Sequence, residues 1–337
     1  MAAASGQQIQ QNDSSSGGRR GGYRSNARNP PYLPTPTERL SLLAYPVILA
    51  FGTLFSILSP ETRAAPYDAG RQSHAQDHTA PSYFARKDNL LNVLFVKRGW
   101  AWVTAAFVAF ALFGHPALLA STRRRIHAVT RWALITACWV LVTQWCFGPP
   151  LIDRGFRITG GRCQAAHEAV AKEGLGAADT KDVFTAAACR AAGGRWSGGH
   201  DISGHVFLLV LGSYFLAQEG GWVLVRAGAL ARPAGVREER CVVMPDGAVK
   251  GAGVEAERDG DGGGDGGAYD PALGLAGRFA VAVIVLCLWM LLMTAIYFHT
   301  WFEKLTGLLV ALMAIYGVYF VPRFVPAVRP FIGLPGI

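Results

Sequence analysis

The amino-acid sequence predicts an all-α, polytopic membrane protein with six transmembrane helices. Of its 337 residues, 51% are hydrophobic and only 16% are charged, whereas soluble domains carry about 25% charged residues. Six apolar runs approach the roughly 20 residues that a helix needs to cross a bilayer. The formal net charge is +9, but the basic residues lie beside the apolar runs. They therefore indicate topology and anionic-lipid contacts, and no nucleic-acid partner is expected.

Each apolar run defines one predicted span. The fourth run is the least regular, because Gln218, Glu219 and two glycines interrupt it. At 1.5 Å per residue, Glu219 is expected near the headgroups, where its carboxylate reaches water. The third run is expected to begin after a basic loop of residues 123–131. The predicted spans are Leu40 to Leu58, Gly99 to Ala120, Trp132 to about Leu151, Ser203 to about Val225, Phe279 to Phe298 and Leu305 to Val321.

The remaining segments are predicted to be tails and loops. Residues 1–37 are rich in Gln, Ser, Gly and Arg, which is typical of a disordered tail. Helices one to four occupy residues 38–225 and include a far-side loop at residues 152–202. Residues 226–277 contain a Gly- and Asp-rich run and are predicted to form a flexible cytosolic insert. The last two helices follow at residues 278–322, and residues 323–337 form a second cytosolic tail.

The distribution of positive charge places both termini in the cytosol. Most unpaired Lys and Arg residues lie in the amino-terminal tail, the loop of residues 123–131, the loop after the fourth span and the carboxy-terminal end. The loop of residues 152–202 then lies on the far side and carries Cys163 and Cys189. In an oxidising lumen these cysteines could form a disulfide, and two free thiols are the alternative.

The stretch from Gly198 to His205 is the first half of the candidate site. It places His200, Asp201, Ser203, Gly204 and His205 where a polar loop meets the fourth apolar run. Ser203 or Asp201 can cap the helix that begins there, and such a helix start attracts anions. The imidazole of His205 would then stand beside a bound anion and could exchange a proton with it. A metal site of His200, Asp201 and His205 is a weaker alternative, because a fourth ligand is missing. We expect neither a metal nor a cofactor.

The second half of the candidate site lies between the fifth and sixth spans. Successive spans alternate in direction, so His205 and His299 should lie at the same membrane face. If the fifth helix continues for one more turn, His299 and Glu303 share a helix face at positions i and i+4. The carboxylate would then hold the imidazole tautomer, as in other His–carboxylate pairs.

Two sequence blocks resemble the fat-storage-inducing transmembrane (FIT) family, in its fungal form. They are Trp196-Ser-Gly-Gly-His-Asp-Ile-Ser-Gly-His205 and Tyr297-Phe-His-Thr-Trp-Phe-Glu-Lys-Leu-Thr-Gly307. The resemblance implies a multi-pass protein of the endoplasmic reticulum (ER) membrane with cytosolic termini, a lumenal site and a bundle like that of the lipid phosphate phosphatases. It also implies an acyl-CoA diphosphatase that supports lipid droplet formation and ER phospholipid homeostasis. The expected products are acyl 4'-phosphopantetheine and adenosine 3',5'-bisphosphate.

The same resemblance assigns roles to the site residues. His299 would be the nucleophile or base at phosphorus, and His205 the acid that protonates the leaving oxygen. Asp201, Ser203, Gly204 and Glu303 would support them. The Lys-x6-Arg-Pro and Ser-Arg blocks with which lipid phosphatases hold phosphate are absent from the matching places, so phosphate contacts are expected from the helix start, with Arg195 or Lys304.

Two other functions remain open from the sequence. The helices could bind diacylglycerol or triacylglycerol and partition neutral lipid into droplets without chemistry, or the chain could be a lipid phosphate phosphatase.

Overall fold

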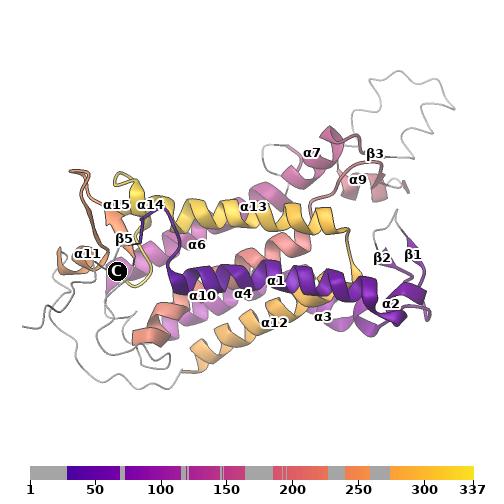
Figure 1. Ribbon diagram of the computed structural model, residues 1–337, viewed down its shortest axis with the longest axis horizontal. Coiled ribbons are helices and arrows are strands. Elements are labelled where there is room, and N and C mark those ends of the chain that lie inside the picture. The colour runs from indigo at the N-terminus through magenta and orange to yellow at the C-terminus, as the bar shows by residue number, and fades with distance from the viewer. Residues whose placement is uncertain are drawn as a thin grey trace, which may run out of the picture.

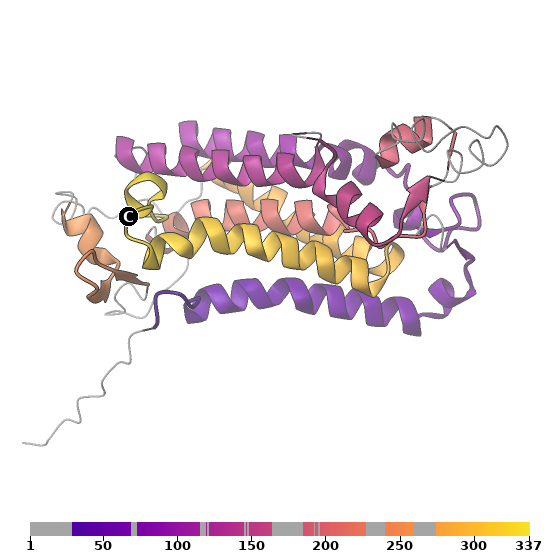
Figure 2. The same cartoon turned by 90° about the horizontal axis from the view of Figure 1, so that it is seen from above.

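Six long helices form the body of the molecule. The computed structural model describes residues 29–68, 73–114, 119, 121–144, 146, 148–163, 185–191, 193–194, 196–226, 240–258 and 274–337. Six helices within these residues are long and apolar enough to cross a membrane, which confirms the predicted fold class. They run side by side in one bundle, and the short elements gather at its two ends (Figures 1 and 2).

The first two spans begin earlier in the chain than the sequence suggested. Helix α1 (Pro36–Leu58) starts with a capping box, in which Thr35 accepts the N–H of Glu38 and Glu38 accepts the N–H of Thr35. It is followed by the short helix α2 (Pro60–Ala64). The second span consists of α3 (Leu90–Leu94), the 3₁₀ turn η2 (Val96–Arg98) and α4 (Gly99–Phe113). Residues 1–28 of the predicted tail lie outside the described residues.

The third span corrects a boundary. Helix α6 (Thr122–Thr143) begins at the arginines that were expected to form a loop, and the Ser121 hydroxyl caps it by accepting the N–H of Arg124. The expected start at Trp132 was therefore wrong by ten residues. The physical reason is that Arg131 is 2% exposed and has an acidic partner inside the bundle, so its charge does not end the helix.

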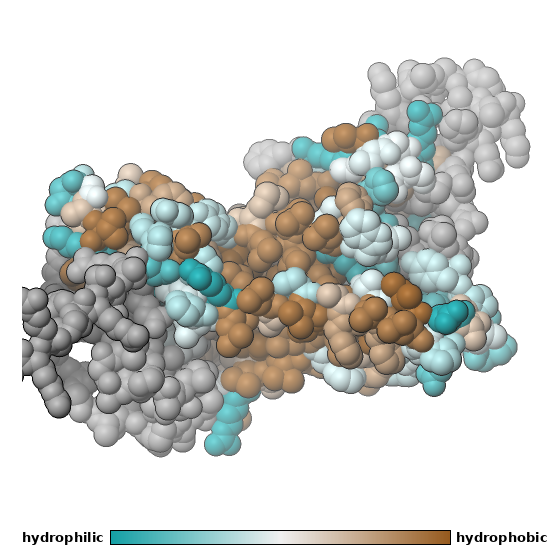
Figure 3. All heavy atoms as spheres, in the orientation of Figure 1, coloured by the Kyte–Doolittle hydropathy of each residue, from teal (hydrophilic) through white to brown (hydrophobic). Residues whose placement is uncertain are grey.

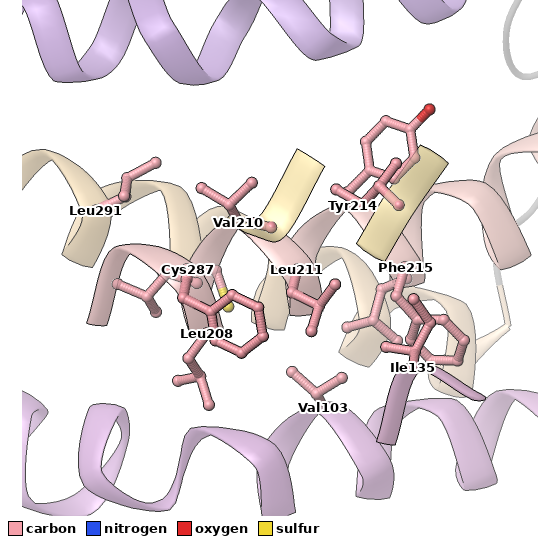
Figure 4. Close-up of a cluster of buried hydrophobic side chains, with 14 of the residues drawn as sticks. Val103, Ile135, Leu208, Val210, Leu211, Tyr214, Phe215, Cys287 and Leu291 are labelled. Atoms are coloured by element: carbon pink, nitrogen blue, oxygen red, sulfur yellow. The ribbon is translucent and has the colours of Figure 1, made fainter. Parts of the chain in front are cut away.

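Helix α10 (Gly204–Arg226) is the centre of the bundle. In the most apolar stretch of α10, 72% of the residues are buried, compared with 17% in the corresponding stretch of α1. Val210, Leu211 and Phe215 of α10 meet Val103 of α4, Ile135 of α6 and residues of α12 (Leu275–Tyr297) in one buried cluster (Figure 4). Helix α13 (Trp301–Tyr319) covers another side of α10 and continues into α14 (Val321–Phe324).

The outside of the bundle is apolar along its middle. In the space-filling view, brown hydrophobic atoms cover the central band, and polar atoms lie towards both ends (Figure 3). On α1 alone, Leu40, Leu43, Val47, Phe51 and Leu54 are each more than half exposed. Such a surface is suited to lipid and not to water. The chain is therefore a multi-pass membrane protein.

Two buried ion pairs lie inside the bundle, away from the start of α10. Arg131 of α6 donates two hydrogen bonds of 2.7 Å to the carboxylate of Glu219, which also accepts a bond of 2.9 Å from Tyr319. Glu219 is 3% exposed, so the expectation that its carboxylate reaches water was wrong. Arg323 of α14 pairs with Glu38 of α1 in the same bidentate manner.

Short elements cover both ends of the bundle. Where α10 and α13 begin, these are β1 (Tyr67–Asp68), β2 (Ser73–His74), η1 (Tyr83–Ala85), α7 (Leu151–Ile158), β3 (Arg162–Cys163), α9 (Ala186–Ala191) and β4 (Trp196–Ser197). β1 pairs antiparallel with β2, and β3 with β4. A disulfide joins Cys163 of β3 to Cys189 of α9, so the bridge was the correct alternative for these cysteines.

At the opposite end, part of the predicted insert has regular structure. Strands β5 (Cys241–Val243) and β6 (Val249–Gly251) form a hairpin, followed by α11 (Gly253–Arg258). The hairpin buries Val242 and Ala252 against Leu334, which follows α15 (Arg329–Ile332) near the carboxy terminus. The Gly-rich run of residues 259–271 lies outside the described residues.

The Arg131–Glu219 pair yields a stability prediction. Arg131→Met should lower the free energy of unfolding by about 3–5 kcal/mol, because it leaves a buried carboxylate without its cation. Adding Glu219→Met should restore part of that loss. Thermal denaturation in detergent measures both effects, with the exposed Arg123→Met as the control. A double variant less stable than Arg131→Met alone would contradict this account.

Candidate active site

The starts of α10 and α13 meet through their backbones. Ser203, which precedes α10, donates its N–H to the carbonyl oxygen of Glu303 in α13 at 3.2 Å. Its hydroxyl caps α10 by accepting the N–H of Val206 at 3.3 Å. Gly307 permits the close approach, because a Cβ atom there would lie 2.6 Å from the Ser203 carbonyl oxygen. This junction fixes the position of each histidine relative to the other.

His205 and His299 face each other across the junction. Their ring centroids are 6.2 Å apart, and both residues are half-buried. His205 lies in the first turn of α10, and His299 lies in the short connection between α12 and α13. The alternation of span direction therefore brings together the two residues that the sequence singled out. A phosphorus atom placed between the rings would be within reach of both.

The connection that carries His299 does not contain the extra helical turn on which the sequence argument for the His299–Glu303 pair was conditional. Helix α12 ends at Tyr297, and His299 has a left-handed backbone with φ of 60°. Thr300 then caps α13 in a capping box with Glu303. Even so, Nδ1 of His299 lies 3.4 Å from Oε2 of Glu303. The pair therefore forms through the cap of α13 and the left-handed conformation of His299, without a continuous helix.

A hairpin from a distant part of the chain supports this connection. Ser73 of β2 forms an isolated antiparallel bridge with Phe298, the residue before His299. The ring of His74 packs edge-on against Tyr297, with the centroids 6.5 Å apart. Both Ser73 and His74 are buried. The left-handed conformation of His299 is thus held from both sides, by β2 before it and by the cap of α13 after it.

Both histidines line a cavity of about 1110 Å³ at this end of the bundle. Four basic residues contribute to its polar wall, and they come from the segment before α4 and from α9: Lys87, Lys97, Arg98 and Arg190. Its apolar wall includes Trp100 and Trp139, which stack at 5.4 Å, together with Leu208, Met290 and Met293. The cavity therefore offers positive charge and apolar surface to one ligand.

Two carboxyl groups in the cavity are only weakly acidic. Burial raises the pKa of Asp201 to about 6, although the nearby His299 opposes this shift. Burial also raises the pKa of Asp153 on α7. Each group is therefore a weaker acid than an exposed aspartate, and Asp201 is about half protonated near pH 6.

The remaining predicted site residues do not all line the cavity. Gly204 lines the cavity, and Ser203 acts as the helix cap beneath it. His200 is exposed and packs on Phe302, with ring centroids 5.1 Å apart, so it does not join His205. Within the part of the chain that the structure describes, no three His, Cys, Asp or Glu residues are arranged to hold a metal ion.

The expected phosphate contacts need a correction. The ammonium group of Lys304 donates to the Ala295 carbonyl and to the Thr53 hydroxyl, so it joins α13 to α12 and α1 instead of facing the cavity. Arg195 lies outside the described residues. Sequence reasoning missed the basic wall of the cavity. Lys97 and Arg98 were among the basic residues beside apolar runs that were interpreted as topology signals. No local pattern distinguishes Lys87 or Arg190.

The fold and the site together define a class of protein. It is a six-helix membrane protein in which two histidines face one cavity. The sequence profile of the fat storage-inducing transmembrane protein (FIT) family matches residues 80–319, and this chain belongs to that family. The matched region contains both histidines.

Several curated relatives carry one activity in their names. Acyl-coenzyme A diphosphatase fit1 of Schizosaccharomyces pombe is 31% identical over 252 residues, which cover 75% of this chain and 78% of the relative. Acyl-coenzyme A diphosphatase SCS3 of Saccharomyces cerevisiae is 26% identical, covering 72% and 90%. Acyl-coenzyme A diphosphatase FITM2 of Mus musculus is 26% identical, covering 74% and 77%. No solved structure gives a significant match.

Asp201 yields a pH-dependent prediction. Its pKa is about 6 in the folded state against 3.8 for an ordinary aspartate, so the folded protein binds this proton more tightly than the unfolded chain. The contribution of Asp201 to stability is therefore greatest below about pH 4 and falls as pH rises towards 6. Asp201→Asn cannot ionise. It should match the wild type at pH 4 and exceed it by up to about 3 kcal/mol at pH 7.5.

Melting temperatures in detergent at the two pH values measure this effect. The exposed Asp88→Asn serves as the control and should show no such gain at pH 7.5. An equal difference between Asp201→Asn and the wild type at both pH values would contradict the assignment.

Proposed function

We propose that this protein is an acyl-CoA diphosphatase of the ER membrane. It hydrolyses the phosphoanhydride of fatty acyl-CoA to acyl 4'-phosphopantetheine and adenosine 3',5'-bisphosphate, and so supports lipid droplet formation and ER phospholipid homeostasis. The observation that carries this proposal is the cavity, where two facing histidines, a basic wall and an apolar wall occur together. The activity named for its relatives agrees with this combination.

The two histidines have different roles in the proposed reaction. Glu303 faces Nδ1 of His299, which leaves Nε2 free for one of two roles. It deprotonates the attacking water, or it attacks the pantetheine phosphorus itself and forms a phosphohistidine, which water then hydrolyses to release acyl 4'-phosphopantetheine. His205 gives a proton to the bridging oxygen as the P–O bond breaks, so that no additional negative charge develops on that oxygen of the leaving nucleotide. The starts of helices favour anions, and Gly204 brings the start of α10 to the cavity wall. Asp201 adjusts the charge beside His299.

The cavity fits both parts of the proposed substrate. The basic wall suits the phosphates of coenzyme A, and the tryptophan and methionine side chains suit the proximal acyl chain. The site lies at one end of the spans, so the remainder of the chain can stay in the lipid. A neutral acylglycerol alone would gain nothing from four basic residues, which favours the enzyme over a binding protein. Binding of diacylglycerol or triacylglycerol to the apolar surface is compatible with the enzyme.

The proposed orientation puts the cavity in the ER lumen and both termini in the cytosol. The disulfide between Cys163 and Cys189 supports this orientation, because such bonds persist in oxidising compartments. The charge distribution favours the same arrangement.

Product analysis tests the activity. Purified protein with oleoyl-CoA should release adenosine 3',5'-bisphosphate in the presence of EDTA. His205→Ala and His299→Ala should each lower kcat at least about 100-fold, because each removes a group that moves a proton or attacks phosphorus. His200→Ala is the matched control, since His200 is exposed and lies outside the cavity lining. If lysophosphatidate were cleaved faster than oleoyl-CoA, the chain would be a lipid phosphate phosphatase instead.

Glycosylation mapping tests the orientation. An Asn-x-Ser acceptor inserted between residues 170 and 180 should be glycosylated in microsomes. The same acceptor inserted at Asp246, in the turn of the β5–β6 hairpin, should remain unmodified. The reverse pattern would place the cavity in the cytosol and would overturn the proposed location.

A further inference from the structure

The basic residues of the cavity differ in their electrostatic partners. Lys87 and Lys97 interact electrostatically with the ring of His205. Arg190 of α9 interacts instead with Asp153 of α7. All four basic residues of the lining are exposed, so exposure does not distinguish them. Helices α7 and α9 lie at the end of the bundle (Figure 1), and the part of the cavity wall that they form is called the mouth. The cavity thus has basic residues both near His205 and at the mouth.

Arg190 is held at the mouth by a covalent link. Helix α9 has only six residues, which is too short to be stable alone. Its residue Cys189 is fully buried and bonded to Cys163. Further bonds fix the helix ends: Ala188 donates to the Thr185 hydroxyl at 3.1 Å, and Gly194 donates to the Cys189 carbonyl at 2.8 Å. The disulfide therefore determines where the guanidinium of Arg190 can reach.

Asp153 is the acidic neighbour of Arg190 at the mouth of the cavity. It is 8% exposed on α7 and belongs to the same cavity wall as Arg190. Burial raises the pKa of the Asp153 carboxyl and Arg190 opposes this shift, so the two groups lie within electrostatic range of each other. A phosphate at the mouth can then form the paired hydrogen bonds that a guanidinium offers.

We propose that Arg190, positioned by the Cys163–Cys189 disulfide, binds the ribose 3'-phosphate of the substrate, while Lys87 and Lys97 bind the phosphoanhydride beside His205. The inference rests on the proposed function, in which the leaving nucleotide carries a second phosphate one ribose away from the bond that breaks. It makes Arg190 a specificity residue that distinguishes a 3'-phosphorylated nucleotide from one without that group.

Kinetics with two substrates test the subsite. Wild-type protein should have a kcat/KM about tenfold higher for oleoyl-CoA than for oleoyl-3'-dephospho-CoA, mainly through KM. Arg190→Gln should bring the two values together by raising the KM for oleoyl-CoA, with little change on the dephospho substrate. Arg162→Gln is the matched control, since Arg162 is exposed, close to the same disulfide and outside the cavity lining. It should keep the wild-type preference.

Reduction tests the part played by the disulfide. Dithiothreitol, or Cys163→Ser with Cys189→Ser, should raise the KM for oleoyl-CoA as Arg190→Gln does, and should leave the dephospho substrate nearly unaffected. An equal loss on both substrates after Arg190→Gln, or no preference in the wild type, would overturn the subsite.

Nucleotide binding separates this proposal from the activity. Adenosine 3',5'-bisphosphate should bind the wild type about tenfold more tightly than adenosine 5'-monophosphate, and Arg190→Gln should remove the difference. If no acyl-CoA were hydrolysed, the proposed function would fail, and this binding ratio alone would decide whether the subsite exists.

Discussion

The backbone contact between the starts of α10 and α13 is the constraint on which the candidate site depends. Ser203 bonds to the carbonyl of Glu303, and Gly307 has no side chain to separate the two helices. His205 follows this contact in the first turn of α10, and His299 precedes it in the connection that leads into α13. Because main-chain atoms set the approach of the two helix starts, the backbones of His205 and His299 are held where their rings come within 6.2 Å. The polar connection and the histidines are therefore one structural unit.

The bundle separates its stabilising charges from its cavity. Arg131 and Glu219 join α6 to α10, and Arg323 and Glu38 join α14 to α1, away from the start of α10. Charges inside a membrane protein are costly unless they are paired, so these contacts hold the helices in one arrangement. At the other end, four basic residues line the cavity together with the carboxyl groups of Asp153 and Asp201. That end is therefore positive, and a polyanionic ligand can complete its charge balance.

The sequence predicted what local patterns encode. Apolar runs located the six spans, and their alternation brought His205 and His299 to one end. Sequence reasoning failed for residues whose position depends on a partner far away in the chain. Arg131 was assigned to a loop because its charge, considered alone, is incompatible with a buried helix. Glu219 was assigned to the headgroup region for the same reason, and in the structure each residue neutralises the other. Lys87 and Arg190 have ordinary neighbours in the chain, and only folding places them on one cavity wall. Hydropathy measures each residue in isolation and therefore cannot detect such pairs.

The left-handed backbone of His299 shows how the two ends of the connection cooperate. A residue with a side chain pays about 1–3 kcal/mol for such a conformation, which persists only where its surroundings enforce it. Here the Thr300–Glu303 capping box enforces it from one side and the Ser73–Phe298 bridge from the other. The family match begins at residue 80, so β2 belongs to a part of the chain that precedes the matched region. For the proposed reaction, the ring is thus aimed before substrate arrives, and no reorganisation is needed at the moment of attack.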